Sequence, residues 1–200
     1  MTSGDFLLPH LTLSFSSIFT SPLSSLYTRF ASQMTSSSSA YKVQSEDLHR
    51  FPYSYYVTPL SSPPSAPNLA PSQRRYFYLD VCPPSSVPTK TTLLLLHGFP
   101  DSSYGWRNIL STLSLSGYRC IAPDLVGYGR TSKPSRLEEY GAHSQAIDLA
   151  GLMDHAMGSK DAKFAVVGHD WGSWLSWKLV NWIPERLLGV HGEYMHASCR

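Results

Sequence analysis

Charged side chains are scarce in this 200-residue chain, at 15% of residues against about 25% in a typical soluble domain. Bases and acids nearly balance, at 16 to 14, and no segment concentrates the bases. This excludes the basic stripe that a nucleic-acid-binding protein presents. Long apolar runs are also missing, because the longest uninterrupted aliphatic run covers only residues 93–96. We therefore expect no nucleic-acid partner and no membrane span.

Cysteine is rare as well. The three cysteines, Cys82, Cys120 and Cys199, are scattered, odd in number and without C-x-x-C spacing. This excludes a disulfide scaffold and a zinc site, and it predicts buried free thiols in a reducing compartment. No metal-ligand spacing and no phosphate-binding glycine loop are present, so we expect neither a metal nor a cofactor.

The first part of the chain has the composition of a disordered segment. Residues 1–45 contain one acid and two bases and are rich in serine, which predicts a disordered leader. With that interpretation we expect a cytoplasmic protein; the alternative is a mitochondrial destination, because transit peptides are also poor in acids and rich in serine. A proline-rich loop is predicted over residues 59–72, where five prolines exclude regular structure.

The folded part, predicted over residues 46–190, alternates strands with helices. Strands alternating with helices of this length indicate βαβ units, and hence an α/β fold with a mostly parallel sheet flanked by helices. Residues 191–200 show neither strand alternation nor a helical stripe, so we expect an irregular C-terminal tail there. The predicted strands cover residues 74–81, 91–96, 118–122, 164–167 and 187–190, and the predicted helices cover residues 106–115, 143–157 and 171–183.

The sequence VGHDWGS at residues 167–173 joins a predicted buried strand to a predicted helix through G-x-D-x-G. This is the setting of a nucleophile elbow, a tight turn that holds its central side chain clear of the sheet. Asp170 occupies the central position. Its carboxylate, with an ordinary pKa of about 3.9, is already anionic at neutral pH and suits displacement at saturated carbon. Taken alone, the pattern also fits a helix-capping aspartate.

Two further motifs follow predicted strands. HGFP at residues 97–100 is placed where a backbone N–H can join an oxyanion hole, paired with the N–H that follows the nucleophile. PDLVGYGRTSKP at residues 123–134 turns through two glycines. We expect Asp124 to shape this loop beside the elbow, and we expect no direct catalytic role for Asp124 or Arg130.

The stretches HGFPDSSYGWR, PDLVGYGRTSKP and GHDWGS, in this order, resemble the α/β-hydrolase fold and, within it, the epoxide hydrolases. The resemblance covers residues 74–190. It implies that Asp170 opens a small-molecule epoxide through an alkyl-ester intermediate, which water cleaves to a diol. It also implies that the backbone N–H groups of Phe99 and Trp171 form the oxyanion hole, and that the Phe99–Pro100 bond is cis. Trp106 and Trp171 are the implied substrate-binding side chains. The oligomeric state is left open.

The family needs more groups than these, namely two cap tyrosines and a later acid and histidine. The only histidines after Asp170 are His191 and His196, which fall where the family's chain leads into the cap, so neither is assigned as the base. We therefore expect the N-terminal part of an α/β-hydrolase, truncated before the cap. On this interpretation the chain as given forms the ester without completing turnover.

Two alternatives stay open. A haloalkane or haloacid dehalogenase-like hydrolase also uses the elbow aspartate, and the Trp171 indole can donate to a departing halide, although Phe99 stands where haloalkane dehalogenases usually have Asn or Glu. The other alternative is a non-catalytic truncated remnant, favoured by the missing acid and histidine. A serine esterase is excluded, because Ser173 lies three positions past the elbow residue.

Overall fold

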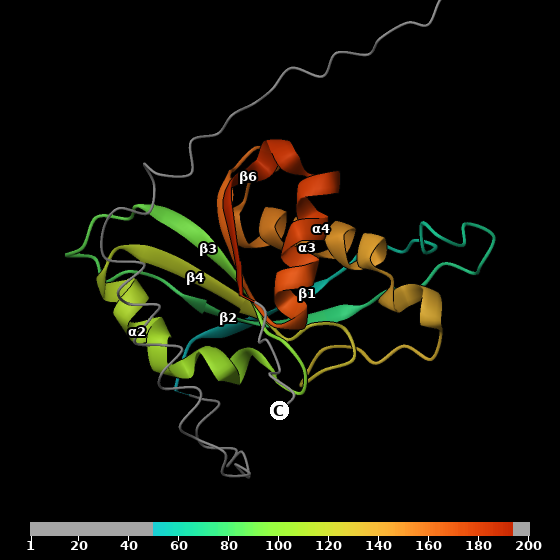
Figure 1. The fold of residues 1–200 in the computed structure, drawn as a ribbon, viewed down its shortest axis with the longest axis horizontal. Helices are drawn as coiled ribbons and strands as arrows, with labels where there is room; N and C mark the ends of the chain where they lie inside the picture. Colours follow the sequence, from blue (N-terminus) through green and yellow to red (C-terminus); the bar gives the residue numbers. More distant parts are fainter. Residues whose placement is uncertain (1–49, 194–200) are drawn as a thin grey trace, which may run out of the picture. The chain divides into compact units, whose positions relative to one another are not determined.

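One mixed sheet forms the centre of the computed structural model, which describes residues 50–193 (Figure 1). Its strand order is β1-β2-β4-β3-β5-β6. The β1–β2 and β2–β4 pairs are antiparallel, while the β4–β3, β3–β5 and β5–β6 pairs are parallel, so the predicted mostly parallel sheet is confirmed. The strands are β1 (Tyr53–Val57), β2 (Arg75–Val81), β3 (Thr91–Leu96), β4 (Tyr118–Pro123), β5 (Phe164–His169) and β6 (Leu187–Glu193).

The chain divides into two units, Met1–Val43 and Gln44–Arg200, and only the second contains described residues. The predicted leader over residues 1–45 therefore lies outside the described part. The predicted proline-rich loop over residues 59–72 forms no helix or strand element, and a bridge between Ser61 and Ser72 closes it at its base. The two backbone hydrogen bonds of that bridge measure 3.2 and 2.9 Å.

Helices cover both faces of the sheet, with α2 on the side opposite to α3 and α4 (Figure 1). The central strand β3 is therefore buried on both faces, and Leu94, Leu95 and Leu96 are fully enclosed. This explains why its sequence is a continuous apolar run without alternation. The helices are α2 (Arg107–Leu115), α3 (Ala142–Met157) and α4 (Trp171–Trp182), with short 3₁₀ helices η2 (Ser103–Trp106), η3 (Leu137–Tyr140) and η4 (Pro184–Arg186).

The strands differ from the prediction in two places. Strand β1 was not predicted, because three of its five residues are exposed and its shape depends on pairing with β2. The predicted irregular tail over residues 191–200 is wrong at its start, since β6 continues to Glu193. His191 pairs with Val167 there, and Glu193 pairs with His169. Partner strands impose both elements, whatever their local pattern.

The prediction of buried free thiols holds for one of the two cysteines in residues 50–193. Cys120 on β4 is buried, and burial raises its pKa to about 12, which keeps the thiol protonated and inert. Cys82 is free but exposed, so the expectation of a buried thiol is wrong at that position. Cys199 lies outside the described residues.

A buried ion pair joins the start of β2 to α3. The Arg74 guanidinium and the Asp148 carboxylate are each 3% exposed, and Arg74 Nη2 donates to Asp148 Oδ1 at 2.8 Å while Nε donates to Oδ2. The Tyr76 hydroxyl donates to the same carboxylate at 2.9 Å. Burial and the neighbouring carboxylate raise the pKa of Tyr76, so its hydroxyl stays a donor. Every oxygen of Asp148 is therefore satisfied.

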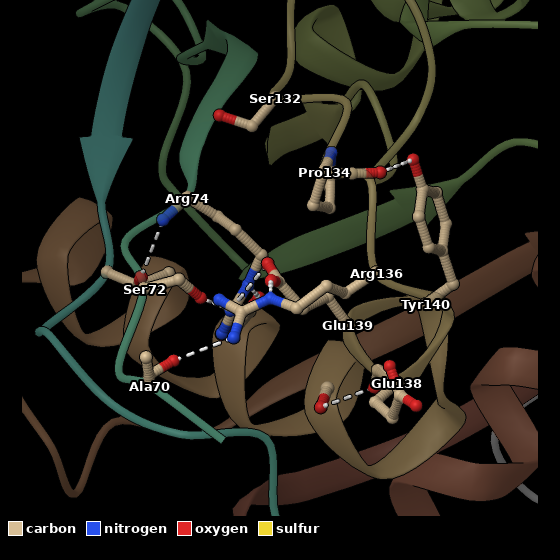
Figure 2. A network of polar contacts seen from close by, with 12 residues as sticks. Ala70, Ser72, Arg74, Ser132, Pro134, Arg136, Glu138, Glu139 and Tyr140 are labelled. Carbon is tan, nitrogen blue, oxygen red and sulfur yellow. Dashed lines mark hydrogen bonds and ion pairs between the residues drawn. The ribbon is translucent and has the colours of Figure 1, made fainter. Parts of the chain in front are cut away.

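Glu139 extends this ion pair to the surface. Its Oε2 lies 3.4 Å from Arg74 Nη1, and its Oε1 accepts from Arg136 Nε at 2.8 Å. Figure 2 shows Arg136 reaching on to the carbonyl of Ala70, which accepts from Nη1 at 2.8 Å. The network thus fastens the proline-rich loop to η3 and α3, although its members are up to 74 residues apart in sequence.

Asp148→Ala tests how much this network contributes to the stability of the fold. We expect the free energy of unfolding to fall by about 3–5 kcal/mol, because the buried Arg74 charge would be left uncompensated. Urea unfolding of the 200-residue chain measures this. The matched control is Asp80→Ala, which removes a bidentate partner of Arg119 in a pair that is 22–23% exposed. We expect that change to cost about 1 kcal/mol or less, and equal losses in the two variants would contradict the argument.

Candidate active site

Asp170 is the turn between β5 and α4. Its φ of 54° and ψ of −120° place it in the region that L residues disfavour, and among residues 50–193 it is the one non-glycine residue with positive φ. Such a conformation costs about 1–3 kcal/mol and persists only where the surroundings impose it. The expected strand–turn–helix elbow is therefore present, with the half-buried Asp170 side chain at its tip.

Close backbone packing imposes this turn. A Cβ on Gly172 would collide with the carbonyl of Leu96, and one on Gly168 would collide with the carbonyl of Gly172. On the facing loop, a Cβ on Gly98 would lie 2.5 Å from the Cβ of Asp170. The glycines of the G-x-D-x-G and HGFP motifs are thus required by the approach of β3, β5 and α4, which leaves no room for side chains.

One carboxylate oxygen of Asp170 is held by the backbone. The N–H of Phe99 donates to Asp170 Oδ1 at 2.9 Å. The Phe99–Pro100 peptide is cis, as expected. Phe99 is 63% exposed and Trp171 is 59% exposed, so both the residue whose N–H binds the carboxylate and the residue that follows Asp170 in the chain are aromatic and open to solvent.

The remaining predicted residues lie at different depths. Trp171 opens α4, and its ring packs edge-on against Trp174 at 5.7 Å between centroids. Its backbone N–H as the second oxyanion donor stays a prediction. Trp106 ends η2 and is only 2% exposed, so it packs within the core of the described part. Substrate contact by Trp106 also stays a prediction.

Asp124 has the structural role that was expected of it. The buried carboxylate accepts from the Ser103 N–H through Oδ1 and from the Arg130 N–H through Oδ2, each at 2.8 Å. A Cβ on Gly129 would collide with Oδ2, so the turn closes tightly on the carboxylate. Asp124 therefore fixes the loop beside the elbow and the start of η2.

His97 has a role that the sequence interpretation missed. The ring is 1% exposed, and its Nε2 accepts from the Leu125 N–H at 2.9 Å. Nδ1 lies 2.9 Å from the Gly98 carbonyl, so Nδ1 carries the proton and donates it, and the ring is neutral. Burial lowers the pKa of His97, although Asp101 and Asp124 partly oppose this. Its position directly before Gly98 in the HGFP motif was the only sequence signal.

The described part of the chain contains neither a metal-binding cluster nor a membrane-spanning helix. Within residues 50–193 no group of three or more His, Cys, Asp or Glu side chains is placed to hold a metal ion. In the same residues, no helix has the length and apolar character needed to cross a bilayer.

The sheet order, the strand–turn–helix elbow and the N–H that faces it define an α/β scaffold with an aspartate at the tip of the elbow. The chain belongs to the alpha/beta hydrolase fold family, which residues 91–192 match.

Its relatives include epoxide hydrolases. The chain is 40% identical over 121 residues to epoxide hydrolase 2 of Siraitia grosvenorii, covering 58% of this chain and 37% of that protein. It is 41% identical over 100 residues to an epoxide hydrolase of Caballeronia sordidicola, covering 50% and 30%. The crystal structure of epoxide hydrolase A from Mycobacterium thermoresistibile superposes with a TM-score of 0.55 at 30% identity, covering 70% and 38%. The chain thus spans about a third of the length of these curated relatives.

Gly172→Ala tests the packing at the elbow. Because the added methyl group meets backbone and not a mobile side chain, we expect the free energy of unfolding to fall by about 1–3 kcal/mol. Gly189→Ala on β6 is the control, since nothing lies within 4 Å of a Cβ there. Thermal unfolding of both variants measures the difference, and a Gly172→Ala protein as stable as Gly189→Ala would refute the close approach.

The lowered pKa of His97 predicts a dependence of stability on pH. The unfolded chain takes up the proton near the ordinary histidine pKa of about 6.5, whereas the folded chain takes it up only at lower pH. Stability is therefore complete above about pH 6.5 and falls on acidification, by at most about 1.4 kcal/mol per pH unit. Denaturant unfolding between pH 7 and 5 measures the slope. His97→Gln should flatten it, and the exposed control His155→Gln should not; equal slopes in both would contradict the assignment.

Proposed function

We propose that this chain carries the ester-forming machinery of an epoxide hydrolase, with Asp170 as nucleophile and the backbone N–H groups of Phe99 and Trp171 as the oxyanion hole. The observation that carries the proposal is the aspartate on a strained elbow, with one carboxylate oxygen already bound by a backbone donor. A capping aspartate would instead bond to the N–H groups of its own helix, and the Asp170 side chain makes no such capping bond.

The two carboxylate oxygens have separate tasks in this reaction. Oδ1 is held by the Phe99 N–H, which leaves Oδ2 to attack an epoxide carbon. The new bond joins Oδ2 to that carbon, the carbon–oxygen bond of the ring breaks, and the released oxygen takes a proton from solvent water. The product is a hydroxyalkyl ester of Asp170 in which Oδ1 has become the carbonyl oxygen.

The same geometry serves the second step. When water adds to Cγ of the ester, the negative charge develops on Oδ1, where the Phe99 N–H already points. Collapse of this intermediate returns the carboxylate and releases a diol. Water needs a base to activate it, and we assign that role to no described residue.

The surroundings of Asp170 favour an apolar substrate. Phe99, whose N–H binds the carboxylate, and Trp171, which follows Asp170 in the chain, are both exposed aromatic residues. An apolar substrate that covered this surface would be stabilised by the removal of apolar area from water. The relatives named as epoxide hydrolases support the same reaction class.

The test is intact-mass spectrometry of the full chain after incubation with styrene oxide. Addition consumes the whole epoxide, so we expect a mass gain equal to that of the epoxide, and peptide mapping should place it on Asp170. Asp170→Asn should gain nothing, because an amide is a poor nucleophile. Asp161→Asn, at an exposed carboxylate away from the elbow, should react like the parent chain.

A parallel incubation with 1-bromobutane separates the alternatives. A dehalogenase-like site would gain the alkyl group while losing bromide, and would leave styrene oxide untouched. A folded chain that forms neither adduct would overturn the proposal in favour of the non-catalytic alternative.

A further inference from the structure

A series of hydrogen bonds connects β2 to the carboxylate of Asp170 through two loops. It begins at the Phe77 N–H and passes through the loop of residues 123–134 before it reaches His97. It then continues through the HGFP loop to Asp170. The bonds are Phe77 N–H to Thr131 Oγ1, Thr131 Oγ1 to the Asp124 carbonyl, Leu125 N–H to His97 Nε2, His97 Nδ1 to the Gly98 carbonyl, and Phe99 N–H to Asp170 Oδ1.

The last two of these bonds meet on a single peptide unit. The carbonyl of Gly98 and the N–H of Phe99 belong to the same planar peptide group, in which they point in opposite directions. His97 Nδ1–H holds the carbonyl end at 2.9 Å, and Asp170 Oδ1 accepts from the N–H end at 2.9 Å. A rotation of this plane would therefore break both bonds together.

The Gly98–Phe99 peptide needs such a restraint, because the rotation of its plane depends on the backbone torsion angle of a glycine. Glycine permits backbone rotations that other residues resist, and the contact with Asp170 prevents any larger residue at that position. The site thus requires flexible backbone at the point where an N–H must be held in one direction. We propose that His97 is the positioning residue that fixes the Gly98–Phe99 peptide plane, and with it the Phe99 N–H on Asp170.

His97 is itself held in place from several sides. Leu125 N–H fixes Nε2, and the ring packs edge-on against Tyr128, with centroids 5.2 Å apart and planes at 78°. The carboxylates of Asp101 and Asp124 are the charged groups that act on the ring. The Asp124 carboxylate accepts from two backbone N–H groups and so holds the loop of residues 123–134 in place. The same loop carries the Leu125 N–H that binds His97.

Two substitutions separate positioning from packing. His97→Asn keeps an amide donor near the place of Nδ1, within reach of the Gly98 carbonyl, but loses the acceptor for Leu125. His97→Gln keeps an acceptor near the place of Nε2 but loses the donor to Gly98. Both remove the ring that packs on Tyr128, so a purely structural role predicts similar behaviour in the two variants.

The first readout is the amide signal of Phe99 in the [¹⁵N]phenylalanine-labelled full chain, assigned by its loss in Phe99→Leu. A hydrogen bond to a carboxylate gives this amide proton a distinctive downfield shift, which we expect to persist in His97→Asn and to move upfield in His97→Gln. The control is His143→Gln on α3, where the ring stacks on Trp182, and it should leave the signal in place.

The second readout rests on the proposed function. At saturating styrene oxide, we expect the rate constant of ester formation to fall about tenfold in His97→Gln, because the carboxylate is no longer held in one orientation for attack. It should stay within about threefold of the parent chain in His97→Asn, because that variant keeps the donor that orients the peptide. The concentration for half saturation should be unchanged in both, because neither variant alters a substrate contact.

The wild-type ring offers a test that needs no variant. ¹⁵N spectra of the labelled histidines should show His97, assigned through its contact with the Leu125 amide, as the neutral form protonated on Nδ1. A proton on Nε2, or equal effects of the Asn and Gln variants on the Phe99 amide, would overturn the proposal. If no ester forms in any variant, the proposed function fails, but the two spectroscopic results still decide the role of His97.

Discussion

The backbone of Asp170 is the constraint to which the rest of the site is fitted. A positive φ at a residue with a side chain is unfavourable, so the turn exists only because β3, β5 and α4 approach too closely for any other path. Gly168 and Gly172 make that approach possible, and the N–H of Ser173 bonds to the Asp170 carbonyl at 2.9 Å to start the helix. The strained conformation sets the direction of the side chain. The Asp170 carboxylate makes no capping bond to its own helix and instead accepts from the Phe99 N–H on the facing loop.

Two buried polar side chains, Asp124 and His97, hold that facing loop, and both have named hydrogen-bond partners. Asp124 is occupied by two N–H groups, and His97 is occupied by a donor and an acceptor. A buried group with its full set of hydrogen bonds contributes order, whereas one that lacks a partner is destabilising by its whole desolvation penalty. The Arg74–Asp148 pair is a satisfied buried group of the same kind at the start of β2, which it joins to α3.

Local chemistry explains which features could be predicted from the sequence. The run of leucines in β3, the G-x-D-x-G turn and the Gly158 end of α3 are each specified by neighbouring residues, and the structure contains all three. By contrast, β1 and the last residues of β6 take their shape from partner strands, and Arg74 meets Asp148 across 74 residues of sequence. The role of His97 depends on where Leu125 lies, which no local pattern encodes.

The parallel pairing of β3 with β5 also orders the events of folding. Leu93 pairs with Ala165, so the loop that closes this contact includes β4 and α3, and contacts between residues so far apart form slowly. The groups that bend the turn at Asp170 lie on β3, including the Leu96 carbonyl, and they are absent until that loop closes. We therefore expect the Asp170 carboxylate to acquire its direction late in folding, and a chain with native helices but an unpaired β5 to carry an ordinary, unstrained aspartate.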